Sequence, residues 1–146
     1  MSIVVANQDN IQEWTSMALK LFPESTFEEE FKLNQKVLDS ESEIGVLYYQ
    51  DGTCVGYMHL SIRNDYVNGT DTSPVVFIEA IYVSPDYRKQ AIASTFINYA
   101  ENYAKEKGIK QLASDCLIKN QLSEIFHKRC GFIEKERVIC FVKDIV

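Results

Sequence analysis

The chain of 146 residues carries 15 Lys+Arg against 21 Asp+Glu, a net charge of −6, and 46% of its residues are hydrophobic. These values are typical of a single globular domain, here residues 1–146, and exclude a wholly disordered chain. An acidic chain lacks the clustered cations that bind nucleic-acid phosphates, and it suits a cationic small molecule better. With no apolar run of about 18 residues and no secretory signal, we expect a cytoplasmic protein.

The four cysteines and two histidines show no spacing typical of a zinc site. We therefore expect no metal centre and reduced thiols, with Cys116 and Cys130 as buried side chains. Neither cysteine has the neighbouring histidine and carboxylate that would suggest an acyl carrier.

Two helices are predicted near the N-terminus. Residues 10–21 place apolar side chains at helical spacing behind Asp9 or Asn10, either of which can cap the helix. The run TFEE at 26–29 is typical of a capping box and predicts a second helix that ends near Leu38.

Three strands are predicted next. IGVLYYQ at 44–50 and TCVGYMHLSI at 53–62 flank Asp51-Gly52, a pair that favours a tight hairpin turn. A polar loop over 63–73 then precedes PVVFIEAIYV at 74–83, the strongest strand signal in the chain.

The second half of the chain alternates between helix and strand. Its apolar spacing predicts a helix, a short strand, a helix and a last strand, at 93–107, 110–116, 120–129 and 133–142. The complete order β–α–α–β–β–β–α–β–α–β predicts an α/β (α+β) fold with a mixed β-sheet flanked by helices. The strand–helix–strand pattern over 74–116 predicts a βαβ unit, with parallel strands, that should cross over right-handed.

A candidate anion site lies between the strand at 74–83 and the helix at 93–107. The turn SPDY at 84–87 and the pair Arg88-Lys89 precede that helix. Its first amides have no partner within the helix, and they stand at the positive end of the helix dipole. Such a site can hold phosphates, and the alternative is a loop with two solvated cations.

The pattern VxPxYRKxxIAxxFIxxAExxAKExG, followed by FHxRxGF, resembles the acetyl-CoA-binding core of the GNAT N-acetyltransferases over residues 74–135. More narrowly, residues 61–83, 113–116 and 127–141 resemble the short aminoglycoside 6′-N-acetyltransferases. The resemblance implies the GNAT fold. It also implies transfer of an acetyl group from acetyl-CoA to the 6′-amine of an aminoglycoside, by direct attack in a ternary complex.

The resemblance further implies a set of cofactor contacts. The backbone of Ile81, Tyr82 and Val83 would pair with the pantetheine arm. Asn120 would contact the cofactor, although it can also serve as the N-cap of the helix that it precedes. Ala91 stands where the family has a glycine, so its methyl either crowds the phosphates or is tolerated at an ordinary φ. The pyrophosphate would be wrapped by Lys89, Gln90, Ala91, Ile92, Ala93 and Ser94.

Glu79 stands inside an apolar strand, where a lone carboxylate is costly unless it is paired or hydrated. One interpretation is a carboxylate on the sheet face bonded to a neighbouring Lys or Arg. The other is a catalytic carboxylate that holds the acceptor ammonium and helps to take its proton, because only the neutral amine attacks a thioester. A backbone N–H near Tyr82 or Val83 could stabilise the oxyanion.

Further acceptor contacts are implied by the subfamily resemblance, and they would form an acidic, partly aromatic site with Glu79. These residues are Phe22, Tyr66, Asp71, Asp115 and Glu136. Taken singly, each is also an ordinary surface residue. His127 is a candidate for protonating the leaving thiolate, since imidazole groups ordinarily titrate near pH 6.5. Its alternative is a histidine on a helix surface.

Two other functions stay open at this point. One is a GNAT enzyme for another amine, such as a polyamine or a protein N-terminus, and the other is an acyl-CoA-binding sensor without activity. Related enzymes make a homodimer the expected assembly, with neither nucleic acid nor membrane as a partner.

Overall fold

The computed structural model describes residues 2–146. Its strands form one mixed sheet in the order β1-β2-β3-β4-β5. The first four strands are antiparallel neighbours, and β5 runs parallel to β4, as the strand–helix–strand pattern predicts. Their bounds are β1 Ser2–Val5, β2 Glu43–Gln50, β3 Thr53–Arg63, β4 Val75–Val83 and β5 Leu112–Ala113.

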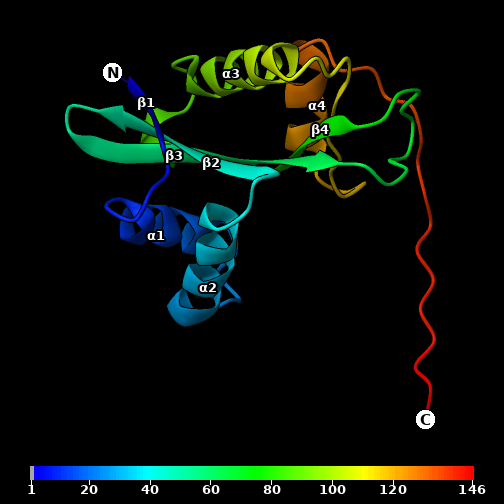
Figure 1. Ribbon diagram of the computed structural model, residues 1–146, viewed down its shortest axis with the longest axis horizontal. Helices are drawn as coiled ribbons and strands as arrows, with labels where there is room; N and C mark the ends of the chain where they lie inside the picture. The colour runs from blue at the N-terminus through cyan, green and yellow to red at the C-terminus, as the bar shows by residue number, and fades with distance from the viewer. Residues whose placement is uncertain (1) are drawn as a thin grey trace.

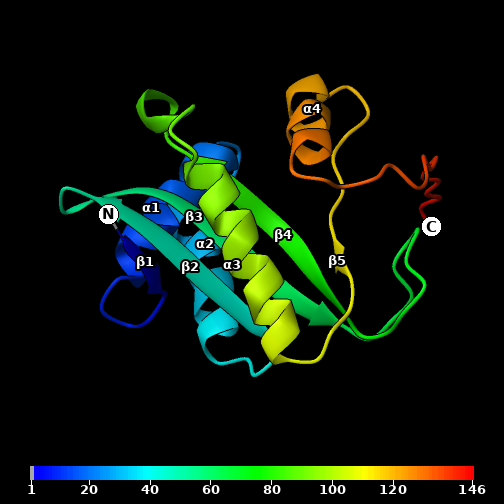
Figure 2. The same cartoon turned by 90° about the horizontal axis from the view of Figure 1, so that it is seen from above.

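The helices cover both faces of this sheet. Figure 1 shows α3 on one face and α1 with α2 on the other, while Figure 2 shows α4 beyond β5. Within residues 2–146, no helix has the length and apolar character needed to cross a membrane. The bounds are α1 Ile11–Leu21, α2 Phe27–Leu38, a 3₁₀ turn η1 at Pro85–Tyr87, α3 Ile92–Glu106 and α4 Gln121–Arg129.

Local signals in the sequence place several of these boundaries. The hydroxyl of Thr26 accepts a hydrogen bond from the Glu29 amide at 3.1 Å and so begins α2, as the capping box predicts. Asp51 and Gly52 take φ values of 52° and 78°, the pair of positive angles that a two-residue hairpin needs. Gly108, at φ 70°, follows the end of α3 in the left-handed conformation common at helix C-termini.

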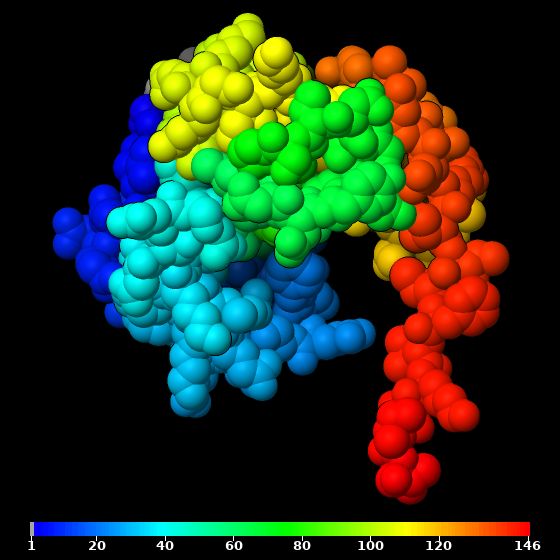
Figure 3. Space-filling view, turned by 45° about the vertical axis from the view of Figure 1, so that its right-hand side comes forward, coloured from blue at the N-terminus to red at the C-terminus, as the bar shows by residue number. Residues whose placement is uncertain are grey.

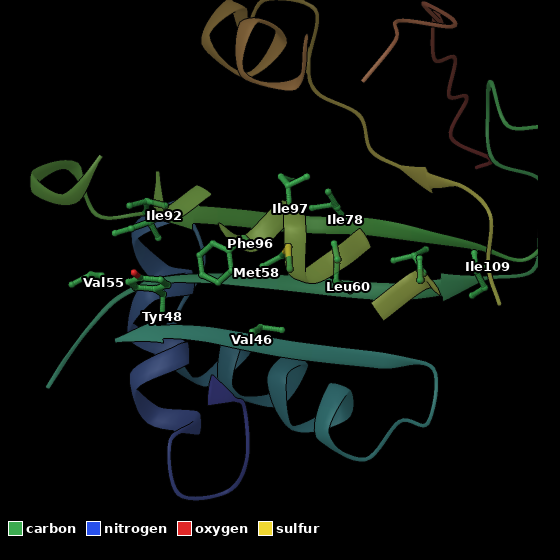
Figure 4. Packing of buried hydrophobic residues seen from close by; sticks show 14 residues of the cluster. Val46, Tyr48, Val55, Met58, Leu60, Ile78, Ile92, Phe96, Ile97 and Ile109 are labelled. Atoms are coloured by element: carbon green, nitrogen blue, oxygen red, sulfur yellow. The ribbon is translucent and has the colours of Figure 1, made fainter. Parts of the chain in front are cut away.

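The main hydrophobic core lies between α3 and the sheet (Figure 4). Phe96 and Ala100 of α3 are fully buried, and they meet Val46, Met58 and other fully buried side chains of β2, β3 and β4. A second cluster, around Trp14, Leu47 and Tyr57, joins α1 and α2 to the opposite face. The sheet is therefore fixed on both sides.

The predicted last strand at 133–142 is wrong for the single chain. No helix or strand follows Arg129, and the sheet ends at β5, which pairs over only two of the seven residues predicted at 110–116. Residues near 135 instead contact the loop at Gly69, and Arg137 pairs with Glu124 of α4 at 3.6 Å. These contacts lead the backbone away from the sheet. We call residues 138–146 the C-terminal arm, which projects from the body in Figure 3.

Candidate active site

The polar centre of the sheet lies on the face of β3 and β4 that carries α1 and α2. Arg63 donates to both carboxylate oxygens of Glu79, with Nη2 2.8 Å from each and Nε 3.0 Å from Oε2. The Ser61 hydroxyl donates to Oε2 of the same carboxylate. The guanidinium of Arg63 also lies 3.6 Å over the ring of Phe77. Glu79 therefore has a neighbouring Arg as its partner, as one of its two interpretations from the sequence predicts.

An irregularity in the pairing of β3 with β4 brings Glu79 to this face. His59 pairs with Ala80 and Leu60 with Ile78, so Glu79 is the extra residue of a bulge. Without the bulge, strict alternation would turn two successive side chains to opposite faces. With it, both Glu79 and Ala80 line one cavity.

That cavity, which we call the acceptor cavity, has a volume of about 310 Å³ between the sheet and α1–α2. It is acidic, because three carboxylates and one Lys lie in its wall. The apolar part of the wall includes the ring of Trp14 and part of Tyr57, whose pKa burial raises, so its phenol stays neutral. The charged members are Glu30, Lys36, Glu43 and Glu79.

His59 also lines the acceptor cavity. Its Nε2 lies 2.9 Å from Oε1 of Glu43 on β2, and its ring meets the edge of Trp14 with centroids 6.4 Å apart. Gly45 makes this packing possible, since a Cβ there would come within 2.6 Å of the Trp14 ring. The imidazole is therefore held from two sides.

The predicted acceptor residues divide into two groups. Phe22 lines the acceptor cavity and also a neighbouring hollow of about 610 Å³ at the α1–α2 turn. Tyr66, Asp71 and Asp115 are exposed and lie outside the cavity wall, as does Glu136. Lys135 packs against Gly69, so the segment that carries Glu136 passes beside the loop that carries Tyr66 and Asp71.

The edge of β4 that faces β5 is open at its C-terminal end. β5 pairs only with Val76 and Phe77, while Ile81, Tyr82 and Val83 pair with β3 alone among residues 2–146. Figure 2 shows the two strands diverging beyond their short contact. An extended ligand with amide groups could add to this edge as a further strand would.

The segment after β4 offers an anion site. Lys89 and Ala91 both have positive φ, at 65° and 64°, and Ala91 directly precedes the first residue of α3 without a side-chain cap. The first amides of α3, at Ile92 and its neighbours, have no intrahelical acceptor. The ordinary-φ alternative for Ala91 is therefore wrong, because an alanine here adopts a conformation that favours glycine.

Two candidate residues lie on α4. Asn120 accepts from the Ser123 amide at 3.1 Å, which confirms its N-cap role. The Nδ1 of His127 lies 2.7 Å from the Ser123 carbonyl and its Nε2 2.8 Å from the Ser114 hydroxyl, just beyond β5. The ring is part-buried between Phe126 and Phe132 rather than free at the helix surface.

The prediction of buried thiols is wrong for Cys116 and only partly right for Cys130. Cys116 is exposed, since it follows β5 on a segment that no element covers, and Cys130 is half-buried at the end of α4. Burial does raise the pKa of the Cys130 thiol, and it raises that of Cys54 to about 11.

Sequence reasoning missed Trp14, Glu43 and His59 as site residues. A usable signal was present for His59, because His59, Ser61 and Arg63 alternate along one predicted strand and so share a face with one another. Trp14 and Glu43 gave no such signal, since only tertiary packing brings them to the same cavity.

Comparison with known proteins fits this arrangement. Residues 8–132 match the acetyltransferase (GNAT) family model. An aminoglycoside N(6′)-acetyltransferase type 1 from Acinetobacter genomosp. 13 is 36% identical over 146 residues, with 99% of each chain covered. The protein of that name from Salmonella enteritidis is 33% identical, with 98% of this chain and 99% of its own covered.

Two solved structures are similar over nearly the whole chain. The aminoglycoside 6′-N-acetyltransferase AAC(6′)-Ig from Acinetobacter haemolyticus, in its apo form, has a TM-score of 0.95 at 34% identity and covers 100% of both chains. AAC(6′)-Iy in complex with the bisubstrate analogue CoA-S-monomethyl-acetylneamine has a TM-score of 0.94 at 32% identity, covering 99% of this chain and 98% of its own. The chain therefore belongs to the GNAT acetyltransferase family, together with the type 1 aminoglycoside N(6′)-acetyltransferases.

Proposed function

We propose that this protein is an aminoglycoside 6′-N-acetyltransferase that uses acetyl-CoA. The observation that carries the proposal is the acidic cavity, whose wall at Glu79 and Ala80 continues into the unpaired edge of β4 at Ile81. A polycation held by the cavity carboxylates would present an amine beside a thioester held along that edge. The names of the relatives support the choice of acceptor.

The cofactor would lie between β4 and α4. The pantetheine amides would bond to the backbone of Ile81–Val83, and the pyrophosphate would sit at the residue 89–94 segment, where α3 begins. Asn120, already the N-cap of α4, would contact the cofactor with its remaining amide group. A relative solved in complex with CoA supports this assignment. The free thiols suit the reducing cytosol, where we place the enzyme.

In the reaction, the neutral 6′-amine attacks the thioester carbonyl carbon, the C–N bond forms and the C–S bond breaks. Glu79 would hold the incoming ammonium, and a backbone N–H at Tyr82 or Val83 would stabilise the oxyanion. The leaving thiolate takes a proton, for which His127 beside Ser114 is the candidate donor. Holding both substrates together would supply much of the acceleration.

The outer part of the acceptor would extend past the cavity. Phe22 could stack on a sugar ring at the cavity mouth, because it lines both hollows and is about half exposed. The residues beyond it supply further carboxylates for the other ammonium groups. We assign this role to Asp71, Asp115 and Glu136, with Tyr66 as an aromatic contact.

Turnover of acetyl-CoA with kanamycin, with spermidine and without an acceptor tests the function. We expect thiol release with kanamycin only. Faster release with spermidine would make the chain a polyamine acetyltransferase. Tight CoA binding without turnover of any acceptor would make it a sensor.

We further propose a homodimer in which two copies exchange their C-terminal arms. The arm contains the unbroken apolar run VICFV at 138–142, which is typical of a strand buried on both faces. In the single chain its side chains stand in solvent, with Phe141 87% and Val142 91% exposed. The free edge of β5 and the exposed apolar residues beside it offer a partner's arm a place to pair. Those residues are Leu117, Ile118, Leu122 and Ile125.

Light scattering and thiol labelling test the exchange. We expect the full chain to have the mass of a dimer and the double variant Phe141→Glu, Val142→Glu to have that of a monomer. Cys140, on the arm, should react slowly with iodoacetamide in the dimer and faster in the double variant, and Cys54, buried in the body of each chain, serves as the unreactive control. A monomeric wild-type chain, or equal reactivity of Cys140 in the full chain and in the double variant, would contradict the proposal.

A further inference from the structure

His59 is a titratable group in the wall of the acceptor cavity for which the reaction above has no use. Its side chain is about one-fifth exposed, and its Nε2 lies 2.9 Å from Glu43 Oε1. A carboxylate accepts hydrogen bonds but has none to donate, so Nε2 carries the hydrogen in this contact. In the neutral ring, Nδ1 is then left with the free lone pair, and no group among residues 2–146 donates to it.

Glu79, the other candidate for taking a proton, is already occupied. Arg63 donates to both of its oxygens, and the Ser61 hydroxyl adds a further bond. Three of these contacts go to Oε2 and only one to Oε1, so Oε1 keeps a lone pair that can accept a hydrogen bond from an ammonium. The carboxylate can still attract an ammonium by its charge, but its geometry suits a fixed anion better than a proton acceptor.

We propose that His59 is the proton acceptor for the substrate ammonium, and that Glu43 stabilises the imidazolium formed. This inference rests on the proposed function. One proton moves from the 6′-ammonium to Nδ1 of His59, and the neutral amine then attacks the thioester carbonyl. The second amine proton goes to solvent as the amide forms, and the leaving thiolate takes a proton from His127 as the C–S bond breaks. His59 then returns its proton to solvent, and His127 regains one.

The position of His59 fits this role. It pairs across β3 and β4 with Ala80, which adjoins the cofactor edge at Ile81. Its imidazole packs against Trp14, which is 1% exposed, and lines the acceptor cavity, so it is held where an amine would bind. A histidine held by a carboxylate in this way is a common arrangement for moving protons near neutral pH.

Charged groups of both signs surround the cavity that His59 lines. Glu30 on α2 and Glu79 on β4 are anionic, as is Glu43. Lys36 on α2 and Arg63 on β3 are cationic. The carboxylates outnumber the cations, which suits a site that must accept a proton from a cationic substrate.

The test is the dependence of kcat/KM on pH, with kanamycin and acetyl-CoA as substrates. For the wild type we expect kcat/KM to rise with pH, because the base must be free of its own proton before it can accept one from the substrate. The kcat/KM of His59→Gln near pH 7 should fall by about 10²–10⁴-fold, and the rise seen in the wild type should be absent there. The variant should recover activity only in alkaline solution, where the amine of the substrate is itself neutral.

Two further variants make the result specific. Glu43→Gln should lower kcat/KM by less than His59→Gln does, since the imidazolium loses its anionic partner while the base itself remains. His127→Gln changes the only other histidine of the chain and should leave the position of the rise unchanged. Thermal melting and CoA titration of each variant show whether the fold and the cofactor site are intact.

The outcomes separate this inference from the proposed function. A wild-type enzyme that does not acetylate kanamycin would overturn the function itself. An active wild type whose pH-dependent rise persists in His59→Gln would overturn the role of His59 alone. An equal loss of kcat/KM at every pH would also overturn the role of His59, because a residue with only a structural role would have that effect.

Discussion

The two faces of β3 and β4 have nearly opposite compositions. Toward α3, Met58, Leu60, Val76 and Ile78 are all 4% exposed or less and pack into the main core. Toward α1 and α2, the residues that alternate with these along the strands form the Ser61–Arg63–Glu79 network and the His59–Glu43 pair.

This difference shows how one strand can serve stability and chemistry at the same time. Successive side chains of a strand point to opposite faces, so adjacent residues can have separate tasks. The bulge at Glu79 is the one place where the alternation of β4 breaks, and it adds a carboxylate to the polar face. Substitutions on the α3 face should therefore change folding, and those on the polar face should change turnover.

The largest effect is expected from Leu60→Ala on the apolar face. Leu60 is fully buried, and its truncation should lower the free energy of unfolding by about 2–5 kcal/mol. Urea denaturation measures this loss. The adjacent Ser61→Ala removes one hydrogen bond to Glu79 and should cost about 0.5–1.5 kcal/mol. Equal losses in the two variants would contradict the division between the faces.

Glu79→Gln should act on the acceptor and leave the cofactor almost untouched. Loss of a charged contact worth about 1.5–3 kcal/mol corresponds to a fall of about 10–10²-fold in kcat/KM for the drug. With Glu79 as an anchor, the loss should appear mainly in KM, and raising the pH should not restore it. A fall in kcat that alkaline pH restores would make Glu79 the base and would contradict the role of His59. Wild-type kinetics would leave Glu79 a structural carboxylate.

Ala91→Gly should have the smallest effect, and it should be favourable. At φ 64°, alanine is in the left-handed region, which costs an L-residue about 1–2 kcal/mol, partly offset by the greater entropy of unfolded glycine. We expect at most about 1 kcal/mol of added stability or tighter CoA binding. Thermal melting and calorimetric titration with CoA measure the two. A large loss of CoA affinity would contradict this account of the loop.

Local chemistry made much of the fold predictable. The capping box at Thr26, the Asp51-Gly52 turn and Gly108 each specify a backbone conformation through residues close in sequence. Strand 133–142 was predicted by the same reasoning, but its apolar run needs a partner that local sequence does not reveal. The structure leaves that run without one inside the chain.

The candidate site was less predictable, because its groups come together by tertiary packing. Glu79 could be found from the cost of a carboxylate in an apolar strand, and the cofactor segment from its position between strand and helix. The hydrogen bonds from Arg63 to Glu79 and the contact of Glu43 with His59 both depend on strand register. The left-handed φ of Ala91 could not be inferred either, since its residue type disfavours it.

On the proposed function, the acidic face of β3 and β4 presents a 6′-amine to acetyl-CoA. The decisive measurement is acetylation of kanamycin and of an aminoglycoside that carries a 6′-hydroxyl, under identical conditions, with the modified atom identified by NMR. We expect a single acetyl group on the 6′-nitrogen of kanamycin and poor turnover of the hydroxyl compound. Equal turnover of both, or acetylation at another nitrogen, would contradict it.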